Sequence, residues 1–160
     1  MNFKPRKHTF AYQLLTMIQR VQSIYLLLAA LISGALVFLI SFGITKDMET
    51  ITIIDLIKDQ RYLIKSIGIG FLASSVLSFL SIFLFKNRQN QFVLGRVNIL
   101  INFYLLGVLL FESLSLPGET FVSKKGIGVF LPIIVIVLLA MANKAIKKDE
   151  NLVKSVDRLR

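Results

Sequence analysis

The sequence predicts an all-α integral membrane protein, a bundle of four antiparallel transmembrane helices with both termini in the cytoplasm. Hydrophobic residues make up 55% of the 160 residues, and the mean hydropathy is +0.72. The apolar residues lie in four long blocks, and most basic residues lie near the ends of those blocks. A soluble domain of this size would expose large apolar patches. A bilayer core about 30 Å thick instead needs roughly 20 apolar residues of helix per crossing.

The first block runs from about Val21 to Ile44 and follows a polar, basic segment without acidic residues. Ser41 and Gly43 form the small-x-small pattern of a signal-peptide cleavage site. A cleaved signal peptide, however, has an apolar region of only about 7–15 residues. We therefore expect a span at 21–44, within a bundle domain at 17–142, and a disordered N-terminal extension at 1–16.

The second block is expected at 63–85, after a mixed loop at 45–62. Within this loop the apolar stretch from Ile51 to Ile57 is too short to cross a bilayer. It is expected at the membrane interface or packed on the helix ends. A short polar turn at 86–91 follows the second block.

The third block is expected at 97–116, where Pro117 and Gly118 give a helix stop. The fourth is expected at 126–142, and Pro132 in its second turn is expected to bend that end.

The last segment, 143–160, is predicted to continue the fourth span as an amphipathic, charged, cytoplasmic helical tail. Glu150 precedes Lys154 by four residues, the favourable order for a helical ion pair. An apolar stripe at near-helical spacing is expected on the membrane surface or against a partner. It consists of Ile146, Val153, Val156 and Leu159.

The charge distribution sets the predicted orientation. With four spans, 13 of the 19 Lys and Arg residues fall on the side of the termini, against three acidic residues. The other side has six basic and six acidic residues, so the whole net charge of +10 lies on one side. The positive-inside rule makes that side cytoplasmic. Because the basic residues lie near span ends, we expect anionic headgroups as their partners and no nucleic acid.

Nothing in the sequence predicts catalysis, a cofactor or a metal. There is no Cys, and His8 is the only histidine, so a metal centre and a His-dependent triad are both unsupported. The letters around Gly68, Gly70 and Ala73 fit a dinucleotide fingerprint, but they lie inside an apolar span with no preceding strand.

Four polar residues at membrane depth are candidates for function. Asn98 and Asn102 share one face of the third span, and their amides need partners in lipid. They could line a path for an ion or substrate, or simply bond neighbouring helices. Glu112 lies at the far end of the same span. It is expected to pair with Lys65 at the helix ends, and a proton-carrying carboxylate is the alternative.

The second span shows Gly70, Ser74 and Ser78 at four-residue spacing, which lets helix backbones approach closely. A helix-packing face is expected here, and a serine-lined pore is the alternative. The pattern does not distinguish packing within the chain from packing between copies.

Two segments carry a family resemblance: Met17-Ile18-Gln19-Arg20-Val21-Gln22-Ser23-Ile24-Tyr25-Leu26-Leu27-Leu28, and the tail, in its stretches Ala142–Glu150 and Val153–Arg160. Together they resemble a short four-span membrane family of the Bacteroidota filed as a domain of unknown function. The resemblance implies an inner-membrane protein and carries no activity or catalytic residue. A polar cytoplasmic rim that docks a partner or headgroups is a further hypothesis. Its residues are Arg20, Lys144, Lys147, Lys148 and Arg158.

The function predicted from these observations is a non-enzymatic accessory or scaffold subunit of a membrane assembly. The expected partners are the bilayer and either another membrane protein or further copies of the chain. A small-solute or ion transporter or channel acting as an oligomer is the alternative, and a lipid-modifying enzyme is the weaker one.

Overall fold

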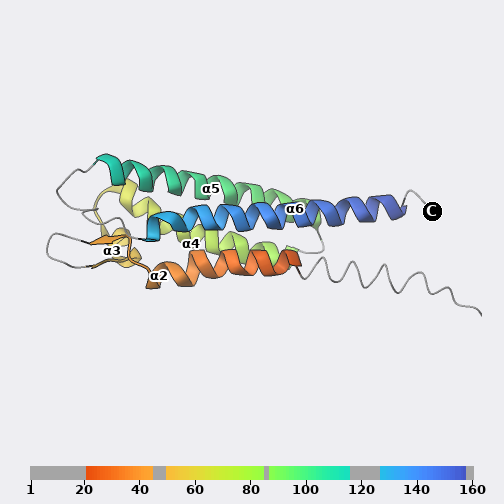
Figure 1. The fold of residues 1–160 in the computed structure, drawn as a ribbon, viewed down its shortest axis with the longest axis horizontal. Coiled ribbons are helices and arrows are strands. Elements are labelled where there is room, and N and C mark those ends of the chain that lie inside the picture. Colours follow the sequence, from red (N-terminus) through yellow and green to blue (C-terminus); the bar gives the residue numbers. More distant parts are fainter. Residues whose placement is uncertain (1–20, 45–49, 85–86, 116–126, 158–160) are drawn as a thin grey trace, which may run out of the picture.

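Four long helices pack side by side as an all-α bundle in the computed structural model, which describes residues 21–44, 50–84, 87–115 and 127–157 (Figure 1). Each is long and apolar enough to cross a membrane: Val21–Leu39, Tyr62–Phe83, Arg88–Glu112 and Ile127–Leu152. The predicted bundle of four apolar helices is confirmed, and the chain is a polytopic membrane protein. Segment 1–16, Arg20 and Arg158 lie outside the described residues.

The first helix ends earlier than predicted. It passes through a π-helical turn, η1 (Ile32–Leu36), and closes with α2 (Val37–Leu39). Ile40 is already extended, and β1 (Gly43–Ile44) then pairs antiparallel with β2 (Thr50–Ile51), with Gly43 opposite Ile51. The prediction of a span up to Ile44 is therefore wrong. Apolarity alone misled it, because the apolar residues after Leu39 include Phe42, which is buried at the end of the bundle.

The short helix α3 (Ile53–Lys58) follows the hairpin. Thr52 and Asp55 form a capping box at its start, which satisfies backbone donors that a helix leaves free. Ile53 and Leu56 are buried in the core together with Ile51 of β2. Of the two expectations for the stretch 51–57, packing on the helix ends is the one observed.

The central helices are α4 (Tyr62–Phe83) and α5 (Arg88–Ser115). The predicted start of the third span, at residue 97, is nine residues too late. Residues 88–96 are helical because Arg and Gln are good helix formers, and because Gln91 is buried rather than free in a turn.

The last helix is α6 (Leu131–Asp157), preceded by the 3₁₀ turn η3 (Ile127–Phe130). Pro132 lies in the first turn of α6, where a missing N–H leaves no helical hydrogen bond unmade. The predicted position of Pro132 in a second turn is therefore wrong, because a 3₁₀ turn and not an α-helical turn precedes α6. The C-terminal part of α6 extends beyond the other helices along the bundle axis (Figure 1). Ile146 is buried, while Val153, Val156 and Leu159 lie outside the described side chains.

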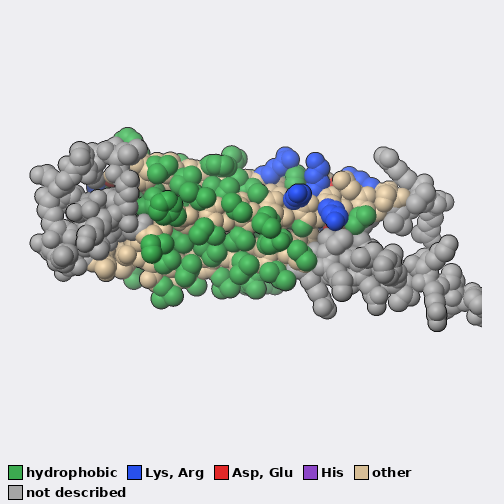
Figure 2. Space-filling view, in the orientation of Figure 1, with side chains coloured by type: hydrophobic (Ala, Val, Ile, Leu, Met, Phe, Trp, Pro, Cys, Tyr) green, Lys and Arg blue, Asp and Glu red, His purple; other side chains and the backbone are tan. Residues whose placement is uncertain are grey.

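The core has two parts. One gathers near α3 and joins α4 to α5 around Phe71 and Leu105. The other joins the first helix to α6 around Leu26 and Leu139. Outside these clusters, large apolar side chains cover much of the face seen in Figure 2, and Lys and Arg gather at the C-terminal part of α6. A lipid environment accommodates such an apolar exterior, because acyl chains are as apolar as the side chains they contact.

Candidate functional site

A seam of buried polar side chains joins α4 to α5. Ser74 and Ser78 lie one turn apart on α4, and Asn98 and Asn102 lie one turn apart on α5. All four are at most 1% exposed. We call these four residues the amide–serine seam. The sequence pattern predicted the serine face of α4 and the asparagine face of α5, and in the structure these two faces are in contact.

The seam is held by short hydrogen bonds. Asn98 Nδ2 donates to the Ser78 hydroxyl at 2.7 Å and to the Ser74 carbonyl at 3.0 Å. Asn102 Nδ2 donates to the Ser74 hydroxyl at 2.7 Å, and also to the carbonyl and side-chain oxygens of Asn98 at 2.9 and 3.1 Å. Oδ1 of Asn102 receives no hydrogen bond from the described residues. The seam therefore ties two helices together and keeps one free acceptor.

Small residues let the helices approach near the seam. A side chain at Gly70 would collide with Leu105 of α5. A side chain at Gly34 of the first helix would collide with Ser75, whose hydroxyl donates to the Ala30 carbonyl at 3.1 Å. Gly70, Ser74 and Ser78 thus form contacts within the chain. A serine-lined pore is not what these side chains make, because their partners are α5 side chains and backbone.

Polar burial continues toward the turn between α4 and α5. Gln91 Nε2 donates to the Ser81 carbonyl at 3.0 Å, and Gln91 is fully buried. On α6, Asn143 fits against Gly95, where a side chain on residue 95 would collide with it. Gln22 of the first helix is also buried. The side-chain oxygens of Gln22, Gln91 and Asn143 accept no hydrogen bond from the described part of the chain.

An ion pair closes this end of the bundle. Arg88 at the start of α5 places Nη2 3.1 Å from Oδ2 of Asp149 on α6. Its Nη1 also donates to the Asp149 carbonyl at 3.2 Å. The Asp149 side chain is 0% exposed and that of Arg88 is 21% exposed, so the buried carboxylate depends on this guanidinium. The contact fixes the distal part of α6 to the α4–α5 turn.

At the opposite end, Glu112 pairs with Arg61 and not with Lys65. Oε2 of Glu112 lies 3.5 Å from Nη1 of Arg61. The predicted partner was wrong because Arg61 precedes α4 and reaches across to α5, whereas Lys65 lies on the exposed surface of α4. An ion pair at the helix ends is nevertheless what forms.

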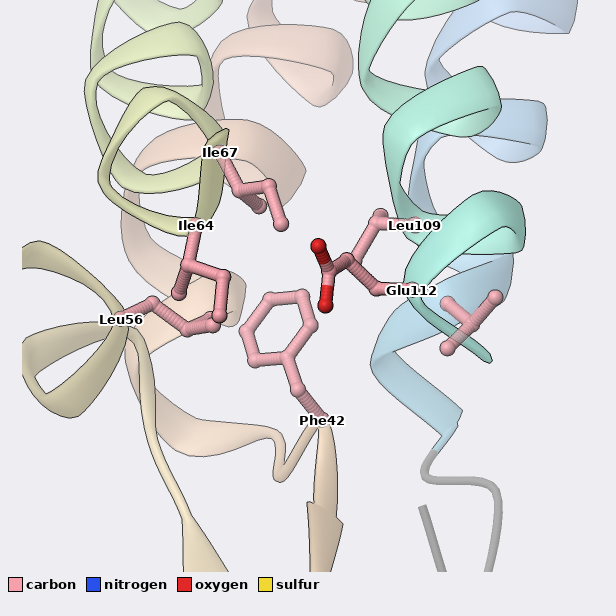
Figure 3. A pocket seen from close by; sticks show the side chains of 7 residues that line it. Phe42, Leu56, Ile64, Ile67, Leu109 and Glu112 are labelled. Carbon is pink, nitrogen blue, oxygen red and sulfur yellow. The ribbon is translucent and has the colours of Figure 1, made fainter. Parts of the chain in front are cut away.

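The Glu112 carboxylate points into a small cavity above the Phe42 ring (Figure 3). The cavity measures about 20 Å³, room for one water molecule. Its walls are otherwise apolar: Leu56, Ile64, Ile67, Leu109 and Val129. The side chain of Glu112 is 13% exposed.

The core between Asn102 and Glu112 is apolar. Leu105 and Leu109 occupy the next inward positions of α5 and are 0% and 5% exposed. Phe71 and Ile67 of α4 belong to the same core cluster. Within the described residues, the amide–serine seam therefore ends at mid-bundle and does not join Glu112.

The basic residues of α6 are on the surface. Lys144, Lys147 and Lys148 are exposed and line one open groove with Asn151, Leu152 and Ser155. Lys154 pairs with Glu150 at 2.6 Å, so the predicted helical ion pair is confirmed. Among the described residues, no group of three or more His, Cys, Asp or Glu side chains could hold a metal ion.

Sequence reasoning missed Arg61, Arg88, Gln91, Asn143 and Asp149. Gln91 had a usable signal, because it precedes Asn98 by seven residues and so shares its helix face. The sequence gives no signal that Asp149 is buried, because it lies within the charged run Lys147-Lys148-Asp149-Glu150, which is typical of a solvent-exposed segment.

The comparison with protein families decides the relationship that the two terminal segments suggested. A family described as a domain of unknown function, DUF4293, matches residues 18–159. The chain belongs to the DUF4293 family. No curated protein matches the chain. No solved structure matches it either. The DUF4293 match covers all four helices, the seam and the Arg88–Asp149 pair, and its description assigns no activity to any of them.

Proposed function

We propose that this DUF4293 chain is a small non-enzymatic protein of the bacterial inner membrane that serves as an accessory or scaffold subunit of a membrane assembly. The observation that carries the proposal is how the buried polar groups are used. The hydrogen bonds of the amide–serine seam join α4 to α5, and the seam ends against Leu105 and Leu109. Because these buried polar groups bond neighbouring helices to each other, they support the role of a rigid structural subunit.

The proposed orientation places both ends of the chain in the cytoplasm. In the bundle, the basic end of α6 lies at the same end as the α4–α5 turn and opposite α3 (Figure 1, Figure 2). Of the nine basic residues that the structure describes, six belong to the first of these two ends: Arg88, Arg96, Lys144, Lys147, Lys148 and Lys154. Positive charge near span ends is retained on the cytoplasmic side.

A transporter or channel acting as an oligomer is the second candidate. The free Oδ1 of Asn102 favours it, since an unpartnered acceptor at mid-bundle is costly unless something binds there. A continuous route would have to lie between copies, because the apolar core around Leu105 blocks the seam within the chain.

The test is purification of the tagged protein from its own membranes in a mild detergent, with particle mass and composition measured together. We expect a second membrane protein at fixed stoichiometry, and a fall in the amount of that protein when this chain is deleted. A homo-oligomer of this chain alone would contradict the proposal.

Such a homo-oligomer would next be assayed for transport in vesicles. Asn102→Leu would be the test variant. Tyr104→Phe would be the control, because Tyr104 lies on the same helix, is half exposed and shares a hydrogen bond with Ser66, outside the seam.

A further inference from the structure

One exposed face of α6 changes from apolar to basic along its length. Val137, Met141, Lys144 and Lys148 follow one another at intervals of three or four residues, so they lie on one side of the helix. Val137 and Met141 are 52% and 43% exposed, and both lysines are exposed. The face therefore offers an apolar strip that leads directly into two cations.

The position of the lysines along the helix matches a headgroup layer. The apolar run of α6 ends at Ala142, and α6 continues along the bundle axis (Figure 1). At about 1.5 Å per residue, Lys144 and Lys148 lie about 3 and 9 Å beyond that point. Phospholipid phosphates occupy the layer next to the hydrocarbon core, which is the level of these ammonium groups.

The lysines are not neutralised by neighbouring acids. Asp149 is paired with Arg88, and Glu150 is paired with Lys154. Among the described residues, no carboxylate oxygen lies within 4.0 Å of Lys144, Lys147 or Lys148. Asp149 and Glu150 thus make their ion pairs with other cations, and Lys147 acts on Glu150 only through its charge, without an ion pair. Three adjacent lysines remain for an external anion.

The three lysines also lie together on one open surface. Lys144, Lys147 and Lys148 line one open groove on α6, which continues along Asn151 and Ser155. The blue side chains in Figure 2 show basic residues gathered directly beside the apolar surface. A phosphate diester with attached acyl chains matches both halves of this surface, whereas a free inorganic phosphate matches only the basic half.

We propose that α6 binds one anionic phospholipid, with its phosphate between Lys144 and Lys148 and an acyl chain along Val137 and Met141. The site is independent of the proposed accessory role and would exist in either a subunit or a transporter. The proposed site differs from the nonspecific attraction of basic residues to anionic headgroups. It predicts one phospholipid per chain, bound at one defined position on α6.

The test is native mass spectrometry of the purified protein titrated with phosphatidylglycerol, and in parallel with phosphatidylcholine. We expect one phosphatidylglycerol to be retained per chain in preference to phosphatidylcholine. The double variant Lys144→Gln/Lys148→Gln should bind phosphatidylglycerol about 30-fold more weakly, the effect of removing two surface lysines near an anionic headgroup.

The matched control is Lys58→Gln/Arg96→Gln, which removes two positive charges from α3 and α5. It should bind phosphatidylglycerol as the wild type does. Equal weakening in both double variants, or equal retention of the two lipids by the wild type, would overturn the site. Displacement of the lipid by inorganic phosphate alone would also overturn it, because the acyl contact would then contribute nothing.

Discussion

The amides of the amide–serine seam show what single residues contribute in this bundle. Ser74 accepts hydrogen bonds from both Asn98 and Asn102, and Ser78 accepts one from Asn98, so each bond depends on the placement of the others. In lipid, a buried amide without such acceptors would have no water to bond. The seam therefore sets the register in which α4 packs against α5, and it also stabilises that contact.

Asn98 and Ser78 should be coupled energetically. Asn98→Ala is expected to lower the free energy of unfolding by about 1 kcal/mol, a typical value for an interhelical hydrogen bond in a membrane protein. With Ser78→Ala already present, the same change should cost less, because its strongest partner is gone. A double-mutant cycle measured by denaturant unfolding in micelles checks this. Strictly additive losses would show that the 2.7 Å contact contributes nothing.

Arg88 should matter more to stability than any exposed arginine. Arg88→Ala leaves the fully buried Asp149 carboxylate without its cation, and is expected to cost about 3 kcal/mol. Replacing both residues by apolar ones, Arg88→Met/Asp149→Leu, should cost much less, because no buried charge remains. Unfolding of both variants in the same detergent gives the comparison. A double variant as unstable as Arg88→Ala would contradict the explanation.

Among the elements, α3 depends on a cap that responds to pH. Hydrogen bonds from the Thr52 hydroxyl and from the Thr52 backbone lower the pKa of Asp55 below its ordinary value of 3.8. The folded pKa is the lower one, so the stabilisation is complete above pH 3.8 and is lost as the pH falls through the folded pKa. Amide exchange in α3 should therefore accelerate in that acid range.

The Thr52→Ala variant tests the same cap from the other side. It removes both the hydroxyl acceptor and the hydroxyl donor, and should destabilise α3 by about 1 kcal/mol. It should also bring the acid-dependent acceleration to higher pH, because the pKa of Asp55 returns toward its ordinary value. The measurement is amide exchange of α3 against pH. An unchanged pH profile would show that the capping box does not govern this helix.

Two glycines of α5 should respond to alanine with opposite signs. Gly95→Ala places a methyl group against Asn143 of α6 and should destabilise the bundle by about 1–3 kcal/mol. At Gly107 nothing lies within 4 Å, so Gly107→Ala should be neutral or stabilise by about 0.5–1 kcal/mol through helix propensity. Thermal unfolding of the two variants gives the signs. A destabilised Gly107→Ala would mean that another chain covers this position.

The elements differ in how far the sequence could predict them. The four apolar blocks located all four helices, because spanning length is a property of local composition. The start of α5 could not be placed, since residues 88–96 open with the polar run from Arg88 to Gln91, which looks like a turn, and pack as helix against α4 and α6. The same holds for Arg61, which reaches Glu112 only because of the way α3 leads into α4. The faces carrying Asn98 and Ser74 were predictable from spacing, but their mutual contact required the fold.

For the whole molecule, the distribution of charge predicts which end faces the cytoplasm. Among the described residues, the end formed by the start of α5 and the distal part of α6 carries six basic residues against three acidic ones, and the end near α3 carries three of each. A bundle of four spans with both ends of the chain inside is the basis of the proposed role and of the lipid site on α6.

Labelling of single cysteines tests this topology most directly, because the chain has no cysteine of its own. Gln60, Gln89 and Asn151 are exposed, and each would be replaced by Cys in a separate variant. With a maleimide that does not cross membranes, Gln60→Cys should react in intact spheroplasts. Gln89→Cys and Asn151→Cys should react only after lysis. Labelling of Gln89→Cys or Asn151→Cys in intact spheroplasts would contradict the four-span bundle with cytoplasmic ends.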